Sequence, residues 1–127
     1  MHLRCLFLSL LLLVPACAAV VPAPQPAPSS GIYGQVTVGP TCPVEQLKDP
    51  CPDRPYQAVL QVLTPEGRTV QQVRTDGSGN FRLGLAPGSY ILHPESPSVM
   101  PRAADVAFTV TAGQFRRIDV VYDSGIR

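Results

Sequence analysis

Short runs of alternating apolar and polar residues, separated by turn-forming residues, fill most of this 127-residue chain. Alternation with a period of two is typical of a strand with one buried face, and no window repeats apolar residues with the period of a helix. Seven such runs follow one another, at 31–38, 56–64, 68–75, 81–85, 89–93, 105–110 and 115–122. They predict an all-β domain over residues 31–127, built as a seven-stranded antiparallel Greek-key sandwich.

The same alternation predicts which side chains form the core, because every second residue of a half-buried strand points inward. About a hundred residues are enough to bury a core of this kind. The predicted inward side chains are Ile32, Val36, Val38, Ala58, Leu60, Val62, Phe81, Leu83, Leu85, Val106, Phe108, Val110, Ile118, Val120 and Tyr122.

The first residues have the order of a secretory signal. His2 and Arg4 precede an apolar stretch at 5–14, and small residues follow it. The run Val-Pro-Ala-Cys that ends at Cys17 resembles a bacterial lipobox, in which the cysteine is acylated and becomes the first mature residue. We therefore expect residues 1–17 to be a signal peptide and Cys17 to be lipidated, which anchors the protein to a membrane outside the cytoplasm. The alternative is cleavage after Ala18, which would give a secreted protein.

Residues 18–30 alternate between proline and small residues. Proline cannot continue a helix or sit inside a sheet, so this segment is predicted to be a semi-extended tether between the anchor and the domain.

Two cysteines, Cys42 and Cys51, lie in a proline-rich stretch at 39–56. A zinc site needs four ligands and a redox motif needs closer spacing, whereas an even number of cysteines outside the cytoplasm predicts a disulfide. A covalently closed loop loses little entropy on binding, so we predict that this loop is the contact surface. Its charged candidates are Glu45, Asp49, Asp53 and Arg54.

The run VRTDGSGNFRLGLAPGSYILHPE, residues 73–95, resembles the carboxypeptidase regulatory-like, prealbumin-type (transthyretin-like) domain. The matching positions are Asp76, Gly79, Phe81, Pro87, Gly88 and Tyr90. Asp76 and Gly79 suit a tight turn, Pro87-Gly88 suits a type II turn, and Phe81 and Tyr90 are expected in the core. The resemblance implies the prealbumin-like fold and a bacterial extracytoplasmic lipoprotein, and it implies no activity.

The sequence gives little support for catalysis. His93 is the only histidine of the domain, and no nucleophile motif such as G-x-S-x-G accompanies it. Transthyretin-like hydroxyisourate hydrolases use a C-terminal Tyr-Arg-Gly-Ser and further histidines, and this chain ends with Tyr-Asp-Ser-Gly-Ile-Arg. We predict no enzyme and no catalytic residue. The alternative is a secreted or lipid-anchored ligand-binding or hydrolase protein that uses the His93 region.

The sequence also gives little support for calcium binding, an isopeptide cross-link or sugar binding. Asp76, Ser78 and Asn80 have the spacing of calcium ligands but lack the distal glutamate, so we predict a plain turn, no metal and no cofactor. An isopeptide-linked pilin or adhesin domain needs a strand lysine, and the only lysine is Lys48 in the loop. Sugar binding would rest on two outward aromatic residues, Tyr33 and Phe115.

The charge balance argues against nucleic acid as a partner. Beyond residue 17, nine basic residues face nine acidic ones, and binding to phosphates needs concentrated positive charge. The partners we predict are the membrane, through the lipid anchor, and an unidentified protein or cell-envelope component. The sequence thus predicts a non-enzymatic, membrane-tethered accessory or binding module that presents the loop at 39–56.

Overall fold

The computed structural model describes residues 16–24, 27–44 and 50–127. These residues form nine strands and no helix. The strands are β1 Gly31–Gly39, β2 Arg54–Pro55, β3 Val59–Leu63, β4 Thr69–Arg74, β5 Asn80–Gly84, β6 Gly88–Pro94, β7 Val106–Val110, β8 Phe115–Arg117 and β9 Val120–Asp123. Most of the predicted signal peptide, together with Glu45 and Asp49 of the loop, lies outside the described residues.

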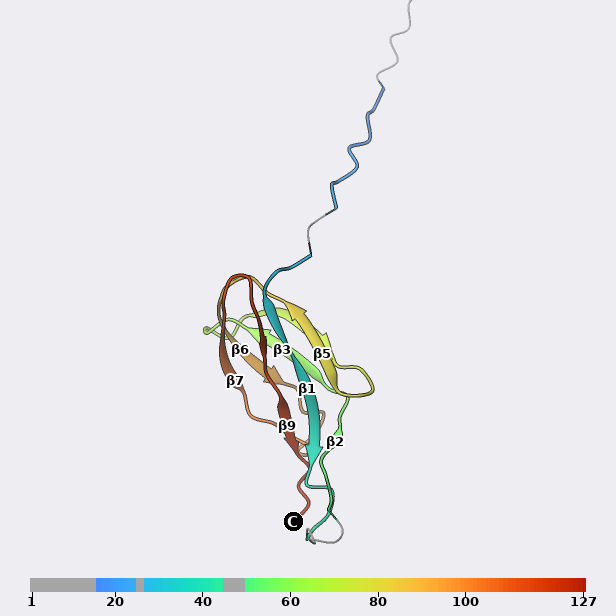
Figure 1. The fold of residues 1–127 in the computed structure, drawn as a ribbon, viewed down its shortest axis with the longest axis vertical. Helices are drawn as coiled ribbons and strands as arrows, with labels where there is room; N and C mark the ends of the chain where they lie inside the picture. The colour runs from blue at the N-terminus through green and yellow to red at the C-terminus, as the bar shows by residue number, and fades with distance from the viewer. Residues whose placement is uncertain (1–15, 25–26, 45–49) are drawn as a thin grey trace, which may run out of the picture.

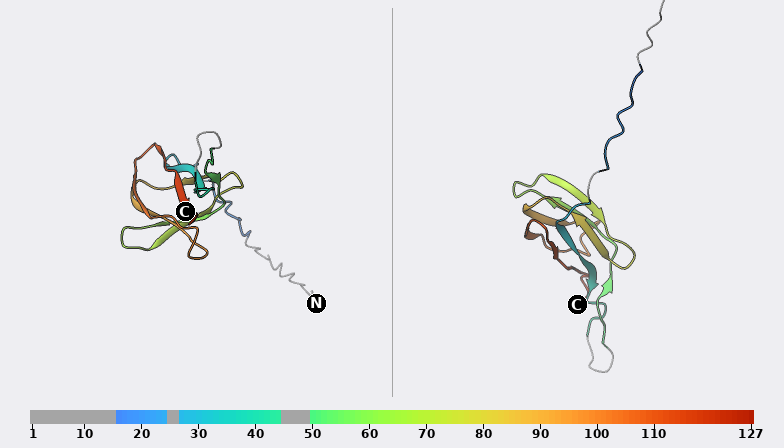
Figure 2. Two further views of the ribbon diagram at one scale, coloured as in Figure 1. Left: turned by 90° about the horizontal axis from the view of Figure 1, so that it is seen from below. Right: turned by 45° about the horizontal axis from the view of Figure 1, so that its top comes forward.

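The strands form two sheets that lie face to face (Figures 1 and 2). In the first sheet β1 is central, with β5 and β2 along one side and β8 and β9 along the other. The second sheet has the order β4-β3-β6-β7, and all of its pairs are antiparallel. The expectation of a purely antiparallel domain is wrong at β1, which runs parallel to both β8 and β9.

The prediction of seven strands is also wrong, for two local reasons. Residues 54 and 55 add a two-residue strand, β2, that pairs with β1. The run predicted at 115–122 is split after Arg117, because the carboxylate of Asp119 accepts the backbone N–H of Gln35 at 2.9 Å. The Asp119 carboxylate thus takes the place of a backbone carbonyl as the partner of Gln35, and a strand begins again at Val120.

The predicted core is confirmed with two small differences. Of the expected inward side chains, all are buried except Val38 and Val106, which are half-buried and pack against the rest. Burying a side chain of this size stabilises the fold by roughly 1.5–3 kcal/mol. The alternation in the sequence therefore identifies the two faces that meet between the sheets.

The turn between β4 and β5 has the predicted geometry. One carboxylate oxygen of Asp76 accepts the backbone N–H groups of Ser78 and Asn80, each at 2.9 Å. Gly79 has a φ of +75°, a left-handed conformation that favours glycine. Asp76 therefore holds its own turn together.

The turn before β6 differs from the prediction. Gly88 has a φ of +155°, whereas a type II turn needs about +80° at this position. The Tyr90 hydroxyl instead closes the bend by donating to the carbonyl oxygen of Ala86 at 2.6 Å. Tyr90 is half-buried, and its ring stacks on that of Phe108 at 5.6 Å between centroids.

The two ends of the sandwich differ in what is attached to them (Figure 1). At one end, here called the proximal end, residues 27–30 lead into β1. Ser30 exchanges two hydrogen bonds with the backbone of Leu85, and Pro28 packs on Gly84, where a Cβ would lie 2.3 Å from the Pro28 ring. The opposite end, here called the stapled end, carries the loop that follows β1 and the C-terminus.

Residues 16–24 carry no helix or strand and are exposed. Within the described part of the chain, no helix is long and apolar enough to cross a membrane.

Candidate binding site at the stapled end

Cys42 and Cys51 form the predicted disulfide, with their Cα atoms 5.9 Å apart. The staple closes the loop that leaves β1 after Gly39 and returns to pair with β1 through β2. The bond gives the two arms of the loop a covalent connection at Cys42 and Cys51.

Further contacts fasten the base of this loop to the end of the chain. The backbone N–H of Ser124 donates to the Gly39 carbonyl oxygen at 2.9 Å, and the Ser124 hydroxyl donates to the Pro40 carbonyl oxygen at 2.6 Å. The Thr41 hydroxyl reaches the Pro52 carbonyl oxygen at 3.3 Å. The C-terminal residues therefore support the loop.

The carboxylate of Asp53 packs directly against Gly39. A Cβ at this glycine would lie 1.8 Å from a carboxylate oxygen of Asp53, so the absence of a side chain lets the two strands of the loop approach. Asp53 and Arg54 are both exposed, as a contact surface requires. The other two predicted charges, Glu45 and Asp49, lie outside the described residues, so their part in the surface stays a prediction.

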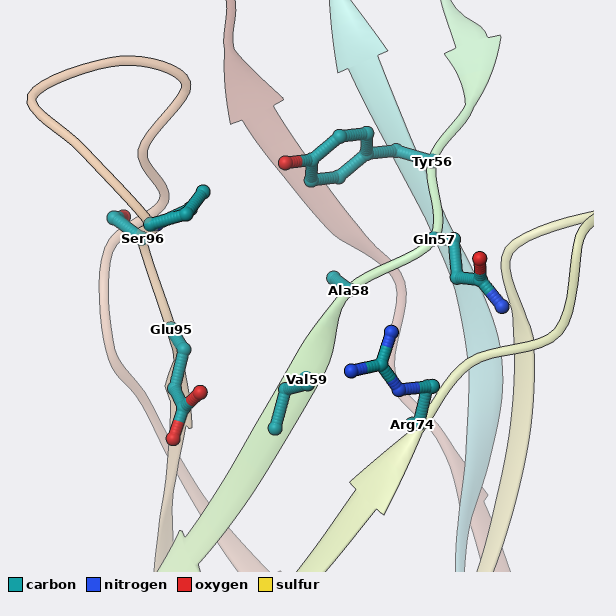
Figure 3. A pocket seen from close by; sticks show the side chains of 8 residues that line it. Tyr56, Gln57, Ala58, Val59, Arg74, Glu95 and Ser96 are labelled. Atoms are coloured by element: carbon teal, nitrogen blue, oxygen red, sulfur yellow. The ribbon is translucent and has the colours of Figure 1, made fainter.

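A hollow of about 290 Å³ opens beside the returning arm of the loop (Figure 3). It joins three segments that are far apart in the sequence, and its volume is near the lower limit for small-ligand sites. Its lining residues are Tyr56, Gln57, Ala58, Val59, Arg74, Glu95, Ser96 and Pro97.

Charges of opposite sign flank the hollow. The guanidinium of Arg74 extends from the end of β4, and the carboxylate of Glu95 lies on the other side of Val59 (Figure 3). Glu95 accepts a hydrogen bond from the side-chain amide of Gln61, and no ion pair reaches Arg74 from the residues that the structure describes. The hollow is therefore suited to a ligand that carries both charge signs, such as a peptide segment.

Buried polar contacts hold the wall of the hollow in place. Tyr56 packs on Tyr122 with 4.8 Å between ring centroids, and the Tyr122 hydroxyl donates to the Glu95 carbonyl oxygen at 2.7 Å. The hydroxyl of Thr75, which is fully buried, accepts the backbone N–H of Ala58 at 2.9 Å. Burial raises the pKa of Tyr122 to about 12, so its phenol stays protonated at neutral pH.

His93 forms a close pair with a carboxylate but lacks the rest of a catalytic group. Its Nδ1 lies 2.6 Å from a carboxylate oxygen of Asp105, and both side chains are about half exposed on the outer face of the second sheet. A general base needs a nucleophile within reach, and no serine, threonine or cysteine bonds the His93 ring among the described residues. The geometry is that of an exposed contact between a histidine and a carboxylate.

Tyr33 and Phe115, the two aromatic residues considered for sugar stacking, both face outward from the first sheet and are half-buried. A guanidinium lies over each ring: Arg82 is 3.6 Å from the Phe115 centroid, and Arg117 is 5.9 Å from the Tyr33 centroid. These rings are therefore not open platforms for a sugar.

Cys17 is exposed and makes no disulfide. At the other terminus, the guanidinium of Arg127 lies 2.7 Å from the Asp123 carboxylate, which lowers the pKa of Asp123 to about 2. The last residues are thus tied back to the end of β9.

Comparison with known proteins yields structural neighbours only. No family model matches the chain, and no curated protein matches it. Among solved structures, the minor pilin GBS52 of Streptococcus agalactiae aligns over 76% of this chain with a TM-score of 0.57 and 15% identity. The Bacillus anthracis TIE protein aligns over 75% with a TM-score of 0.52 and 17% identity.

The aligned region is only part of each neighbour, 45% of the pilin chain and 17% of the TIE chain. At these identities the likeness concerns the fold of the β-domain alone. It places the two-sheet architecture among domains of bacterial proteins.

Proposed function

We propose that this chain is a non-enzymatic, lipid-anchored module outside the cytoplasm, which binds a protein or cell-envelope partner with its stapled end. Cys17 carries the lipid, residues 18–30 act as the tether, and the domain has the Greek-key connectivity of the prealbumin-like class. Two structural neighbours from bacteria, one of them a minor pilin, are consistent with a role at the cell surface.

One observation carries the proposal: the segment that leads to Cys17 and the disulfide-closed loop are attached to opposite ends of the same strand, β1 (Figure 1). A domain anchored through its proximal end would therefore present the loop away from the membrane. The hollow between Arg74 and Glu95 lies beside that loop and enlarges the contact surface. Loops positioned by a rigid scaffold are frequent binding surfaces.

The loop is tested by cross-linking in the native host. Residues 43–50 are replaced by a Gly/Ser segment of equal length, with Cys42 and Cys51 retained, and cross-linked partners are compared with those of the native chain. We expect the specific cross-links to disappear. The matched control replaces the turn at 65–67, which lies at the proximal end, and should leave the cross-links in place. Unchanged cross-links in the loop variant would reject the binding role.

The anchor is tested separately by the intact mass of the mature protein from the same host. We expect a chain that begins at Cys17 with a diacylglyceryl group and with the domain two hydrogens lighter than its reduced mass. A chain that begins at Ala19 without lipid would show a secreted protein and would remove the tether from the proposal.

A further inference from the structure

Arginine side chains gather on the outer face of the first sheet, next to the proximal end. Tyr33, near the start of β1, pairs across the sheet with Arg82 of β5 on one side and Arg117 of β8 on the other. Both arginines are exposed, and the Arg82 guanidinium covers the Phe115 ring at 3.6 Å. Strand register thus places two cations and two aromatic rings on one small surface.

A third arginine lies on the other side of β8. Arg116 is exposed and lines a hollow of about 360 Å³ that also includes Pro65, Tyr90 and Thr109. Its neighbours along the strand, Phe115 and Arg117, point the opposite way because side chains alternate. The cationic surface therefore continues around the edge of the sheet.

Two of these three charges are not neutralised by the protein. Arg117 forms an ion pair with Asp119 at 3.0 Å, which lowers the pKa of that carboxyl. Arg82 and Arg116 have no acidic partner among the residues that the structure describes. Each remains available to an external anion.

The described acids lie mainly elsewhere. Only Glu66, in the turn after β3, joins Asp119 in the proximal half, where Arg68 adds a fourth arginine. The rest of the described acids lie at or next to the strand ends that face away from the proximal end: Asp53, Asp76, Glu95, Asp105 and Asp123. A domain with no net charge is therefore positive at its proximal end.

We propose that the surface formed by Arg82, Phe115 and Arg117, extended around the edge strand β8 by Arg116 on its other side, binds the anionic surface of a lipid bilayer. Its position decides between a bilayer and other anions. Residues 27–30 are fixed to the domain, so residues 18–26 alone separate this surface from Cys17, a span of about 28 Å in an extended proline-rich chain. This choice rests on the proposed lipid anchor, because the anchor would hold the proximal end within that distance of lipid headgroups.

The chemistry suits headgroups. Arginine forms paired hydrogen bonds with phosphate. Basic side chains contribute to binding at anionic membranes only within a Debye length of the surface.

The test uses a chain from residue 17 onward with Cys17→Ser, which contains every contact described above and cannot be acylated. Co-sedimentation with vesicles is measured at low salt and millimolar lipid, with phosphatidylglycerol or with phosphatidylcholine alone. We expect binding to the anionic vesicles only, and its loss at high salt. The pair Arg82→Gln and Arg116→Gln should weaken binding about 25-fold, since each arginine contributes about fivefold.

The matched control, Arg102→Gln with Arg127→Gln, removes the same charge from the stapled end and should bind like the unchanged chain. Both variants are first checked for native thermal unfolding. Absence of binding to anionic vesicles, or equal weakening in the two variants, would overturn the proposal. Binding to a soluble acidic polysaccharide but not to vesicles would overturn it in favour of a cell-envelope polymer. Because this chain carries no lipid, the result is independent of whether Cys17 is acylated in the host.

Discussion

The Tyr122 hydroxyl donates a hydrogen bond of 2.7 Å to the carbonyl oxygen of Glu95, so that β9 of the first sheet is bonded to the end of β6 in the second. Tyr122 is fully buried, and its ring also supports Tyr56 at the wall of the hollow. This contact therefore joins the core to the candidate site.

Replacing Tyr122 by phenylalanine should lower the free energy of unfolding by about 1–2 kcal/mol, because the Glu95 carbonyl would lose its partner in a partly buried place. Urea denaturation measures the change. Tyr90→Phe is the matched control, since the Tyr90 hydroxyl bonds an exposed carbonyl of Ala86 that water can satisfy, and it should cost less. Equal losses in the two variants would contradict a special role for Tyr122.

Stability should fall as the pH rises from 10 to 12. The folded-state pKa of Tyr122 is raised from 10.0 to about 12, mainly because burial disfavours the phenolate. Below the pKa of tyrosine in the unfolded chain, the shift contributes its full stabilisation to the fold. This contribution is lost as the pH rises toward the pKa of Tyr122 in the folded protein, so the free energy of unfolding should fall by roughly 2–3 kcal/mol in total. Urea unfolding across this window should show the decline, and Tyr122→Phe should show a smaller one. Parallel curves for the two proteins would argue against this assignment.

Substitution of Gly34 by alanine should destabilise the domain by about 3 kcal/mol, at the upper end of the usual cost of overpacking. The new Cβ would lie 1.8 Å from the backbone carbonyl oxygen of Ile118, which cannot rotate away. Gly77→Ala is the control, because no atom lies within 4 Å of a Cβ there, and its effect should stay within about 0.5 kcal/mol. Chemical denaturation measures the free energy of unfolding of both variants. A tolerated alanine at Gly34 would mean that β1 and the segment between β8 and β9 can move apart at little cost in free energy.

The paired change of Cys42 and Cys51 to serine should cost about 3 kcal/mol, because an open loop gains entropy in the unfolded state. Thermal unfolding with and without a reductant measures it. The reductant should destabilise the native chain by a similar amount and leave the double variant unchanged. A native chain that is insensitive to reduction would show that the staple does not contribute to stability.

Much of the fold could be predicted from the sequence, because the buried face of each strand follows from the local alternation of apolar and polar residues. Phe81, Leu83 and Leu85 alternate cleanly, and all three are buried. The break between β8 and β9 is different in kind, since it depends on Asp119 meeting Gln35, a residue 84 positions away. The parallel pairing of β1 with β8 and β9 is equally non-local, and nothing in the short runs themselves specifies it.

The candidate site also has a part that the sequence predicts and a part that it does not. The disulfide could be predicted from the two cysteines of the loop and the compartment that the first residues lead us to expect. The hollow could not be, because Tyr56, Arg74 and Glu95 come together only through the β3–β4 and β3–β6 pairings. Likewise, Arg82 and Arg117 become neighbours only because both pair with Tyr33.

The position of β1 has a mechanical consequence. A pull applied between residue 27 and the stapled loop would run along this strand, which shares backbone hydrogen bonds with β2, β5, β8 and β9. Such a load passes along the covalent backbone of β1, which is already extended, and the Cys42–Cys51 bond limits how far the segment between the two cysteines can lengthen. Tension between these two points would therefore lengthen the domain little, because β1 is an extended strand.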